Sequence, residues 1–169
     1  YIALLGTSLP VIGVHHAFGD YQRRSRRVFA QLYRKRLSLL GVSDAVRDDM
    51  RRCLPGWAPE RIVTLHNRVN TFALQKQLLP AAEARQALGL APDAWIIGNV
   101  GRLHPDKDQA TLLRGFAQAW AKLPQEALLV IIGSGRLEQS LKDLAVELGI
   151  AERVRFLGQV AQARLYFKA

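Results

Sequence analysis

The sequence of 169 residues is short of several features that identify a protein class. It has one cysteine, Cys53, which excludes an internal disulfide and a cysteine-rich metal site and suits a reducing compartment. No apolar run approaches the roughly 18–20 residues that a membrane span needs, and no signal peptide is visible. Hydrophobic residues nevertheless make up 49% of the chain, which excludes a disordered protein and predicts a globular core.

Common catalytic and nucleotide-binding motifs are also absent. The stretch that follows Gly101 lacks the GK[ST] ending of a P-loop, which argues against nucleotide hydrolysis by that route. The segment 133–138 has Glu138 where a dinucleotide fingerprint needs its third glycine, so an NAD-linked enzyme is disfavoured. No HExxH, CxxC or GxSxG motif occurs.

Acidic residues are missing from one strongly basic stretch. The net charge is +10, and residues 21–36 carry seven cations without a single Asp or Glu. These cations are Arg23, Arg24, Arg26, Arg27, Arg34, Lys35 and Arg36. Two interpretations stay open: a solvated helix face, or a patch for membrane headgroups, a phosphorylated lipid or nucleic acid.

Strands alternating with helices predict an α/β fold with parallel sheets. Apolar runs at 9–14, 37–42 and 62–65 are expected strands, the first of them buried, and Ser43 or Asp44 is a suitable N-cap for a helix over 45–52. We expect a first part over residues 1–66, a connection with a short helix over 67–92, and a second part over 93–169.

The second part has the pattern of a doubly wound fold. Its expected strands are 95–100, 127–132 and 154–157, and the middle one is apolar throughout, as in strands covered on both faces. Its expected helices are 108–123 and 137–148, each with an apolar stripe at spacings of three and four.

Ligands of open α/β sheets bind beyond the carboxyl ends of the strands. In the second part these ends are 101–102, 133–135 and 158–160, where glycines would let the backbone approach a ligand and helix N-termini favour anions. Arg102 can bind phosphate oxygens in a bidentate manner, and Lys107 adds a point charge. The alternative is ordinary strand-ending glycines beside solvated cations.

Four segments together resemble the retaining glycosyltransferases of family 4 (group 1), which have the two-domain GT-B fold. The segments are LLGVSDAVRDDM, IVTLHNRVNTFAL, GNVGRLHPDKDQATLLRGFAQA and LLVIIGSGRLEQSLKDLAVELGIAERVRFLGQV. They cover about residues 37–160 in the order and spacing of the family. The resemblance implies that the chain contains Rossmann-like parts of both domains, each incomplete, as an internal piece of a longer enzyme.

The resemblance also assigns roles to residues of the second part. Arg102 and Lys107 match the basic pair that holds the diphosphate of a nucleotide-sugar donor, and Gly101 lets the backbone approach it. Two further stretches match loops that line the nucleoside. Their residues are Gly133, Ser134, Gly135, Leu157, Gly158, Gln159 and Val160.

A histidine in the first part is the expected contact to the donor sugar. His16 lies six residues past Pro10, as in the PVVVTVHG-type segments of the family, and His15 is the alternative because the pair leaves the register ambiguous. A strand-end histidine with purely local partners is the competing interpretation for both.

The chain departs from the family pattern at three places. Arg68 and Asp108 stand where the family usually has glycine, and Asp108 is a candidate N-cap instead. The paired glutamates of the family, separated by seven residues, are absent, since no two Glu have this spacing. We therefore expect this chain by itself to be inactive in transfer.

The resemblance implies that the parent enzyme moves a sugar from a nucleoside diphosphate donor to a hydroxyl acceptor with retention of configuration. It needs no metal or other cofactor, because Arg102, Lys107 and helix dipoles supply positive charge. The basic stretch points to an anionic lipid or glycan acceptor, as in lipopolysaccharide synthesis, and to a cytoplasmic protein at the inner face of the membrane. The alternative is a non-enzymatic nucleotide- or nucleic-acid-binding module.

Overall fold

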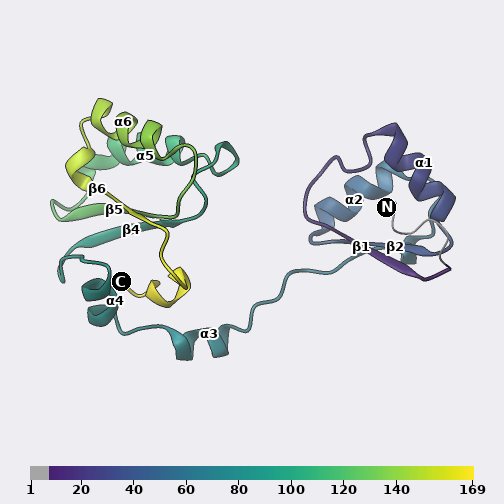
Figure 1. The fold of residues 1–169 in the computed structure, drawn as a ribbon, viewed down its shortest axis with the longest axis horizontal. Helices are drawn as coiled ribbons and strands as arrows, with labels where there is room; N and C mark the ends of the chain where they lie inside the picture. Colours follow the sequence, from purple (N-terminus) through teal and green to yellow (C-terminus); the bar gives the residue numbers. More distant parts are fainter. Residues whose placement is uncertain (1–7) are drawn as a thin grey trace. The chain divides into compact units, whose positions relative to one another are not determined.

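The computed structural model describes residues 8–169 and divides the chain into two compact units. Unit 1 is Tyr1–Val69 and unit 2 is Asn70–Ala169. Each unit contains one three-stranded, wholly parallel sheet with helices between the strands (Figure 1). The α/β class predicted from the sequence is therefore confirmed. The boundary between the units lies inside the segment expected as the connection, and α4 of that segment belongs to unit 2.

Unit 1 packs two helices on one face of its sheet (Figure 1). The elements in chain order are β1 Val11–His15, α1 Arg24–Tyr33, β2 Leu37–Gly41, α2 Asp44–Cys53, a 3-10 turn Pro59–Arg61 and β3 Ile62–Thr64. The strands lie in the order β1-β2-β3. Ser43 accepts a hydrogen bond from the backbone N–H of Val46, which confirms the expected N-cap of α2.

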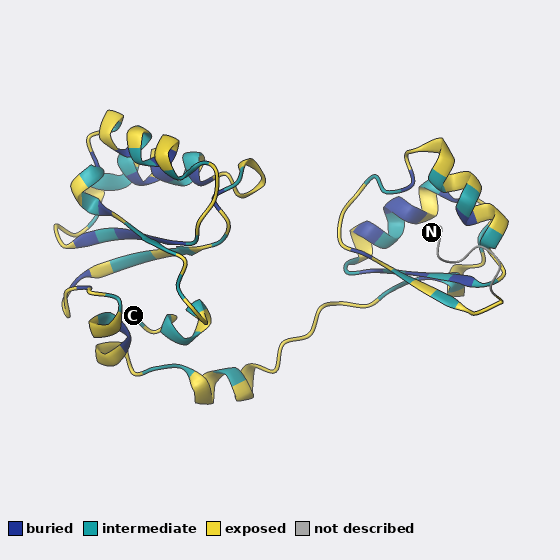
Figure 2. Cartoon of the chain, in the orientation of Figure 1, coloured by how far each residue is buried: buried dark blue, intermediate teal, exposed yellow. Residues whose placement is uncertain are grey.

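The expectation that the first strand is buried is wrong for the described residues. Side chains alternate along β1, and Ile12 and Val14 on the face away from α1 and α2 are 66% and 53% exposed. Figure 2 shows this alternation in colour. The apolar run is real, but the helices cover only one face, and Leu37 and Leu39 of β2 form the core on that face.

Unit 2 has helices on both faces of its sheet (Figure 1). Its strands are β4 Trp95–Val100, β5 Ala127–Ile132 and β6 Val154–Gly158, in the order β4-β5-β6. Its α-helices are α3 Thr71–Gln77, α4 Ala81–Ala87, α5 Gln109–Ala119 and α6 Glu138–Glu147. Short 3-10 turns occupy Pro105–Lys107, Trp120–Lys122, Ala151–Arg153 and Ala163–Tyr166. Helices α5 and α6 cover one face, while α4 and the last 3-10 turn cover the other.

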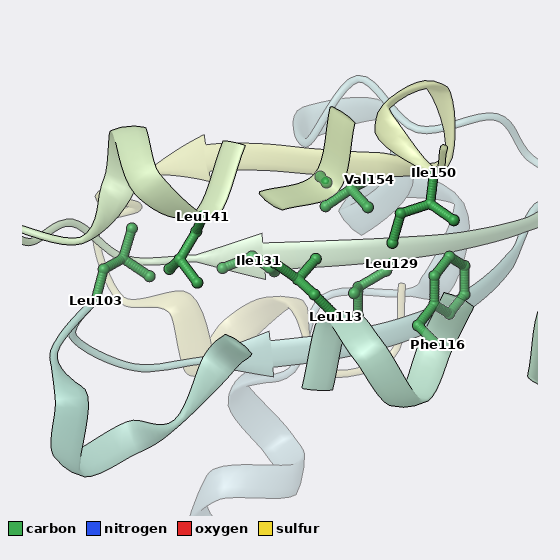
Figure 3. Packing of buried hydrophobic residues seen from close by; sticks show 9 residues of the cluster. Leu103, Leu113, Phe116, Leu129, Ile131, Leu141, Ile150 and Val154 are labelled. Atoms are coloured by element: carbon green, nitrogen blue, oxygen red, sulfur yellow. The ribbon is translucent and has the colours of Figure 1, made fainter. Parts of the chain in front are cut away.

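The main core of unit 2 lies between β5 and the pair α5 and α6 (Figure 3). Leu129 and Ile131 point into this cluster, whereas Val130 and Ile132 point into the apolar cluster on the α4 side. The prediction that this strand is covered on both faces is thus confirmed. Leu103, which follows β4, is 1% exposed in the same core and anchors the loop after β4. Burying such a side chain stabilises its position by about 2 kcal/mol.

Two general features of the described residues bear on function. Within residues 8–169, no helix is both long enough and apolar enough to cross a bilayer. The same part of the chain contains no cluster of three or more His, Cys, Asp or Glu side chains arranged to hold a metal ion.

Candidate functional site

Three loops meet at the carboxyl edge of the unit 2 sheet, and backbone hydrogen bonds join them. The Gly101 N–H donates to the Ile132 carbonyl at 2.9 Å, and the Leu103 N–H donates to the Ser134 carbonyl at 3.0 Å. The Gly133 N–H donates to the Gly158 carbonyl at 2.7 Å. The glycine-containing loops that the sequence placed at one edge therefore form a single connected surface.

The glycines of the β5 loop serve backbone packing as well as any ligand. A Cβ atom on Gly133 would come closer than 3.0 Å to the carbonyl oxygen of Gly101, and one on Gly135 would do the same at Leu103. Gly133 also has a φ of 139°, which side-chain-bearing residues rarely adopt. We expected glycine here to let the backbone approach a ligand. The close packing of the neighbouring loop already requires glycine at both positions. Gly101 differs, since its Cβ would meet only Gln109, at 3.9 Å.

The Arg102 side chain is available for a ligand while its backbone is fixed. The side chain is 72% exposed, and its Nη2 lies 3.6 Å from Asp106 Oδ2, too far for a strong ion pair. Its carbonyl accepts a 3.0 Å hydrogen bond from Nε2 of Gln109, a residue at the start of α5 that is 1% exposed. Gln109 therefore fixes the Arg102 main chain without restricting its side chain.

Lys107 lies one residue before the cap of α5. It ends the 3-10 turn Pro105–Lys107, is exposed, and is followed by Asp108, whose carboxylate accepts from the Thr111 N–H. The expected capping role of Asp108 is confirmed. Its φ is 47°, a left-handed conformation that glycine adopts without strain and aspartate tolerates. The geometry thus explains how Asp can stand at a position where the family usually has glycine.

Sequence reasoning missed the role of Asp106. Its carboxylate pairs with His104 Nδ1 and lies near Arg102. The hydrogen bond from His104, followed by the charges of His104, Lys107 and Arg102, lowers the pKa of Asp106 below its usual value. The loop therefore carries a carboxylate among its cations. The acid was visible in the sequence, two residues after His104, but its direction toward Arg102 was not.

Donor groups follow the β5 strand directly. The backbone N–H groups of Ser134, Gly135 and Arg136 donate to no acceptor within residues 8–169. All three residues are exposed, and they precede α6. Consecutive unpaired N–H groups at the carboxyl edge of a parallel sheet can bind the oxygens of an anionic or carbonyl-bearing ligand.

The β6 loop contributes less than the sequence suggested. Leu157 and Val160 are half-buried and pack in the apolar cluster on the α4 side. Gly158 uses its carbonyl to hold Gly133, and Gln159 is exposed. Among the four residues predicted to line the nucleoside here, Gly158 and Gln159 lie at the joined loops, and the other two contribute to packing. Their contact with a nucleoside stays a prediction.

His15 and His16, the two candidate histidines of unit 1, have different surroundings. His15 is buried, its Nδ1 lies 2.7 Å from Asp20 Oδ2, and its Nε2 lies 3.2 Å from the Tyr21 hydroxyl. His16 is exposed, and no hydrogen bond or ion pair involves its side chain within the described residues. Both ring nitrogens of His15 are thus occupied locally, so of this pair His16 is the one whose ring is available to a ligand. Its contact to a donor sugar stays a prediction.

The predicted basic patch is mostly on the surface of unit 1. Arg23, Arg24, Arg27, Arg34 and Lys35 are exposed and pair with no carboxylate in the described chain. Arg26 differs, because its Nη1 lies 2.6 Å from Asp20 Oδ1. Arg36 lies over the Tyr33 ring at 4.9 Å. The patch therefore has five available cations, and Arg26 and Arg36 serve the local structure.

Comparison with known protein sequences identifies a family. The model of the family described as "Glycosyl transferases group 1" matches residues 80–169. The D-inositol 3-phosphate glycosyltransferase of Nocardia farcinica is 43% identical over 90 residues, 50% of this chain and 20% of that protein. The enzyme of the same name from Thermobispora bispora is 36% identical over 115 residues, 63% of this chain and 26% of that protein. The chain thus spans about a fifth to a quarter of the length of these relatives.

Solved structures share the fold over most of the chain. HepE of Anabaena, crystallised with UDP, matches with a TM-score of 0.71 at 21% identity, over 92% of this chain and 43% of that one. WaaG, described as a glycosyltransferase involved in lipopolysaccharide biosynthesis, matches with a TM-score of 0.69 at 17% identity, over 94% of this chain and 48% of that one. These likenesses confirm the expected fold, with the parallel sheets of the GT-B glycosyltransferases.

Proposed function

Because the chain belongs to the glycosyl transferases group 1 family, we propose that it is part of an enzyme that transfers a sugar from a nucleoside diphosphate donor to a hydroxyl acceptor. The observation that carries this proposal is the joined loop surface of unit 2. It combines the exposed Arg102, the exposed Lys107 and three unpaired N–H groups at one sheet edge. The names of the sequence relatives and the UDP complex of HepE support it.

The proposed chemistry of unit 2 is stabilisation of the leaving group. As the bond from the sugar to the diphosphate breaks, negative charge grows on the nucleoside diphosphate. Arg102 can donate two parallel hydrogen bonds to phosphate oxygens, and Lys107 and the N-terminus of α5 add positive potential. Donors fixed before the reaction stabilise such charge more than mobile solvent does. The proposal assigns this role to the protein's own cations and includes no metal or other cofactor.

Donor binding by this chain tests the proposal without requiring catalysis. We expect UDP to bind by isothermal titration calorimetry and UMP to bind about tenfold or more weakly, because a charge-assisted hydrogen bond contributes about 1.5–3 kcal/mol. Arg102→Ala should weaken UDP binding by a similar factor and leave UMP nearly unchanged. Arg114→Ala, an exposed arginine of α5 outside the loop surface, is the matched control. Equal binding of UDP and UMP would contradict the diphosphate site.

We further propose retention of the sugar's anomeric configuration and an anionic acceptor of the cell envelope. The names of the sequence relatives contain an inositol phosphate, which is anionic. WaaG is described as involved in the biosynthesis of lipopolysaccharide, a cell-envelope glycolipid. The five available cations of unit 1 suit such an acceptor and a protein at the inner face of the membrane. NMR of the product made by the full-length enzyme tests retention, and an inverted anomer would refute it. Transfer to lipopolysaccharide core and to inositol phosphate should be compared in the same assay, and transfer to a neutral sugar alone would refute the anionic acceptor.

A further inference from the structure

We infer that unit 1 carries a docking surface for a bilayer containing anionic phospholipid. We name it the α1 surface: the outer face of α1 with a pocket next to the end of that helix. This bilayer would be the membrane partner of the proposed enzyme, so the biological purpose of the surface rests on the proposed function. The binding itself requires neither a donor nor sugar transfer, so it can be measured separately.

Positive charge is concentrated in one stretch of unit 1. Residues 21–36 hold seven basic residues and no acidic ones, and the rest of unit 1 holds five basic and five acidic residues. The whole net charge of unit 1 therefore lies in this one stretch. A juxtaposed anionic bilayer attracts each nearby Lys or Arg with about 1 kcal/mol, an effect that falls off within a Debye length.

Apolar side chains lie exposed among these cations. Val28 and Leu32, four residues apart on one face of α1, are 53% and 76% exposed. Arg24 and Arg27 flank them at helical spacings, and Ala30 faces the core with no exposed area. Figure 2 shows the exposed face of α1 in yellow. A helix whose outer face combines aliphatic side chains with arginines is typical of helices that lie in a membrane interface.

A pocket beside α1 suits a phosphate-bearing headgroup. A groove on α1 is lined by Arg24, Arg27, Val28, Gln31, Leu32 and Arg34. Next to it, a pocket of about 430 Å³ is lined by residues that include Arg34, Lys35, Trp57 and Arg61. Arg34 lines both the groove and the pocket, so the two hollows adjoin at the end of α1.

Trp57 lines the pocket and carries a hydrogen-bond donor that lacks a partner. Its Nε1 is buried and has no acceptor among the described residues, a condition that native proteins usually avoid. Three cations, Arg34, Lys35 and Arg61, line this hollow with a single acid, Glu60, so its formal charge is positive and suits the oxygens of a phosphodiester. The aliphatic face would enter the interface while the pocket holds a headgroup.

The same cations do not favour nucleic acid. Binding single strands needs aromatic rings on which bases can stack. The aromatic residues of α1, Phe29 and Tyr33, are only half-exposed, and their rings stack on each other at 4.4 Å between centroids. The outer face of α1 presents aliphatic side chains instead. These side chains can enter the boundary of the acyl chains in a bilayer, but they offer no ring on which a base can stack.

Vesicle co-sedimentation of the 169-residue chain tests the inference. The vesicles are pure phosphatidylcholine, or phosphatidylcholine with 30% phosphatidylglycerol. Variant one is Arg24→Gln with Arg27→Gln, variant two is Val28→Ser with Leu32→Ser, and variant three is Trp57→Phe. The matched control, Arg114→Gln with Lys122→Gln, removes the same charge from exposed positions in unit 2. Thermal unfolding confirms that each variant is folded.

We expect wild-type chain to bind the anionic vesicles and to bind neutral vesicles only marginally. Removing two arginines should weaken binding about 30-fold, at about fivefold for each cation, and the control should change it less than threefold. The aliphatic variant should lose about tenfold or more, and Trp57→Phe should lose about threefold because the pocket's N–H is gone.

Equal binding to the two kinds of vesicle, or an equal loss in the control, would overturn the inference. So would tighter binding to an oligonucleotide than to anionic vesicles at the same salt concentration. A wild-type chain that binds anionic vesicles but does not bind UDP would contradict the proposed function and leave the α1 surface supported. The reverse result would contradict the α1 surface alone.

Discussion

Alanine at Gly133 separates two reasons for a glycine in the β5 loop. Its Cβ would enter the space of the Gly101 carbonyl oxygen, at less than 3.0 Å, and its φ of 139° is strained for any L side chain. Backbone strain of this kind costs about 1–3 kcal/mol, and forced displacement of packed neighbours costs about 1–3 kcal/mol more. We therefore expect Gly133→Ala to reduce the free energy of unfolding of unit 2 by about 2–6 kcal/mol.

The assay is urea unfolding followed by NMR signals of the β5 amides, which report on unit 2 and not on unit 1. Gly115→Ala is the matched control: Gly115 lies in α5, and its Cβ would meet nothing within 4 Å. It should raise stability by up to about 1 kcal/mol, because alanine favours helix. A Gly133→Ala protein as stable as wild type, with only UDP binding lost, would refute the packing argument and restore ligand approach as the reason for the glycine.

Three further predictions concern side chains whose roles the structure revealed. Asp106→Asn removes the carboxylate nearest Arg102, so UDP should bind about two- to fivefold more tightly by calorimetry, and weaker binding would show that Asp106 positions the arginine. Gln109→Leu leaves the Arg102 carbonyl without its donor and should lower the free energy of unfolding by about 1–2 kcal/mol in urea titration; an unchanged midpoint would contradict the role of that hydrogen bond. The hydrogen bond with His15, mainly, lowers the pKa of Asp20 below 3.8, so Asp20 stabilises unit 1 above that pH and the stabilisation is lost as pH falls through the lower folded-state pKa. Urea midpoints of unit 1 between pH 5 and pH 2 should fall more steeply in wild type than in Asp20→Asn, and parallel curves would contradict this linkage.

The elements that the sequence predicted well are those defined by repeated apolar spacing. The strands at 95–100 and 127–132 were predicted to the residue, since a mainly apolar run between turn residues indicates both the type and the limits of a strand. Helix α5 was predicted to start at Asp108 because a capping side chain marks that end. It ends at Ala119, and a separate 3-10 turn follows over Trp120–Lys122, a tightening that spacing alone does not encode.

The site was predictable in position and less so in detail. Parallel strands bring their carboxyl ends to one edge, so the order of strands alone placed Arg102 near Gly133 and Gly158. Sequence could not reveal which polar groups satisfy each other. The pairing of His15 with Asp20 and Tyr21 depends on the turn after β1. Helix α3 was not predicted because it has no buried residue and therefore no apolar stripe.

The two proposed anion-binding surfaces differ in how their charges are arranged. In the loop of unit 2, Arg102 and Lys107 are balanced by Asp106 and Asp108, so the formal charge of this segment is zero. We therefore expect diphosphate binding there to depend on directed, short-range hydrogen bonds from the guanidinium and the unpaired N–H groups. The α1 surface has the opposite character, since its cations are unbalanced and act through a field that extends over a Debye length. A donor site needs selectivity for one ligand, whereas a membrane-binding surface needs long-range attraction to the bilayer. Acids stand beside the cations of the unit 2 loop and are missing from the basic stretch 21–36 of unit 1, which fits this difference.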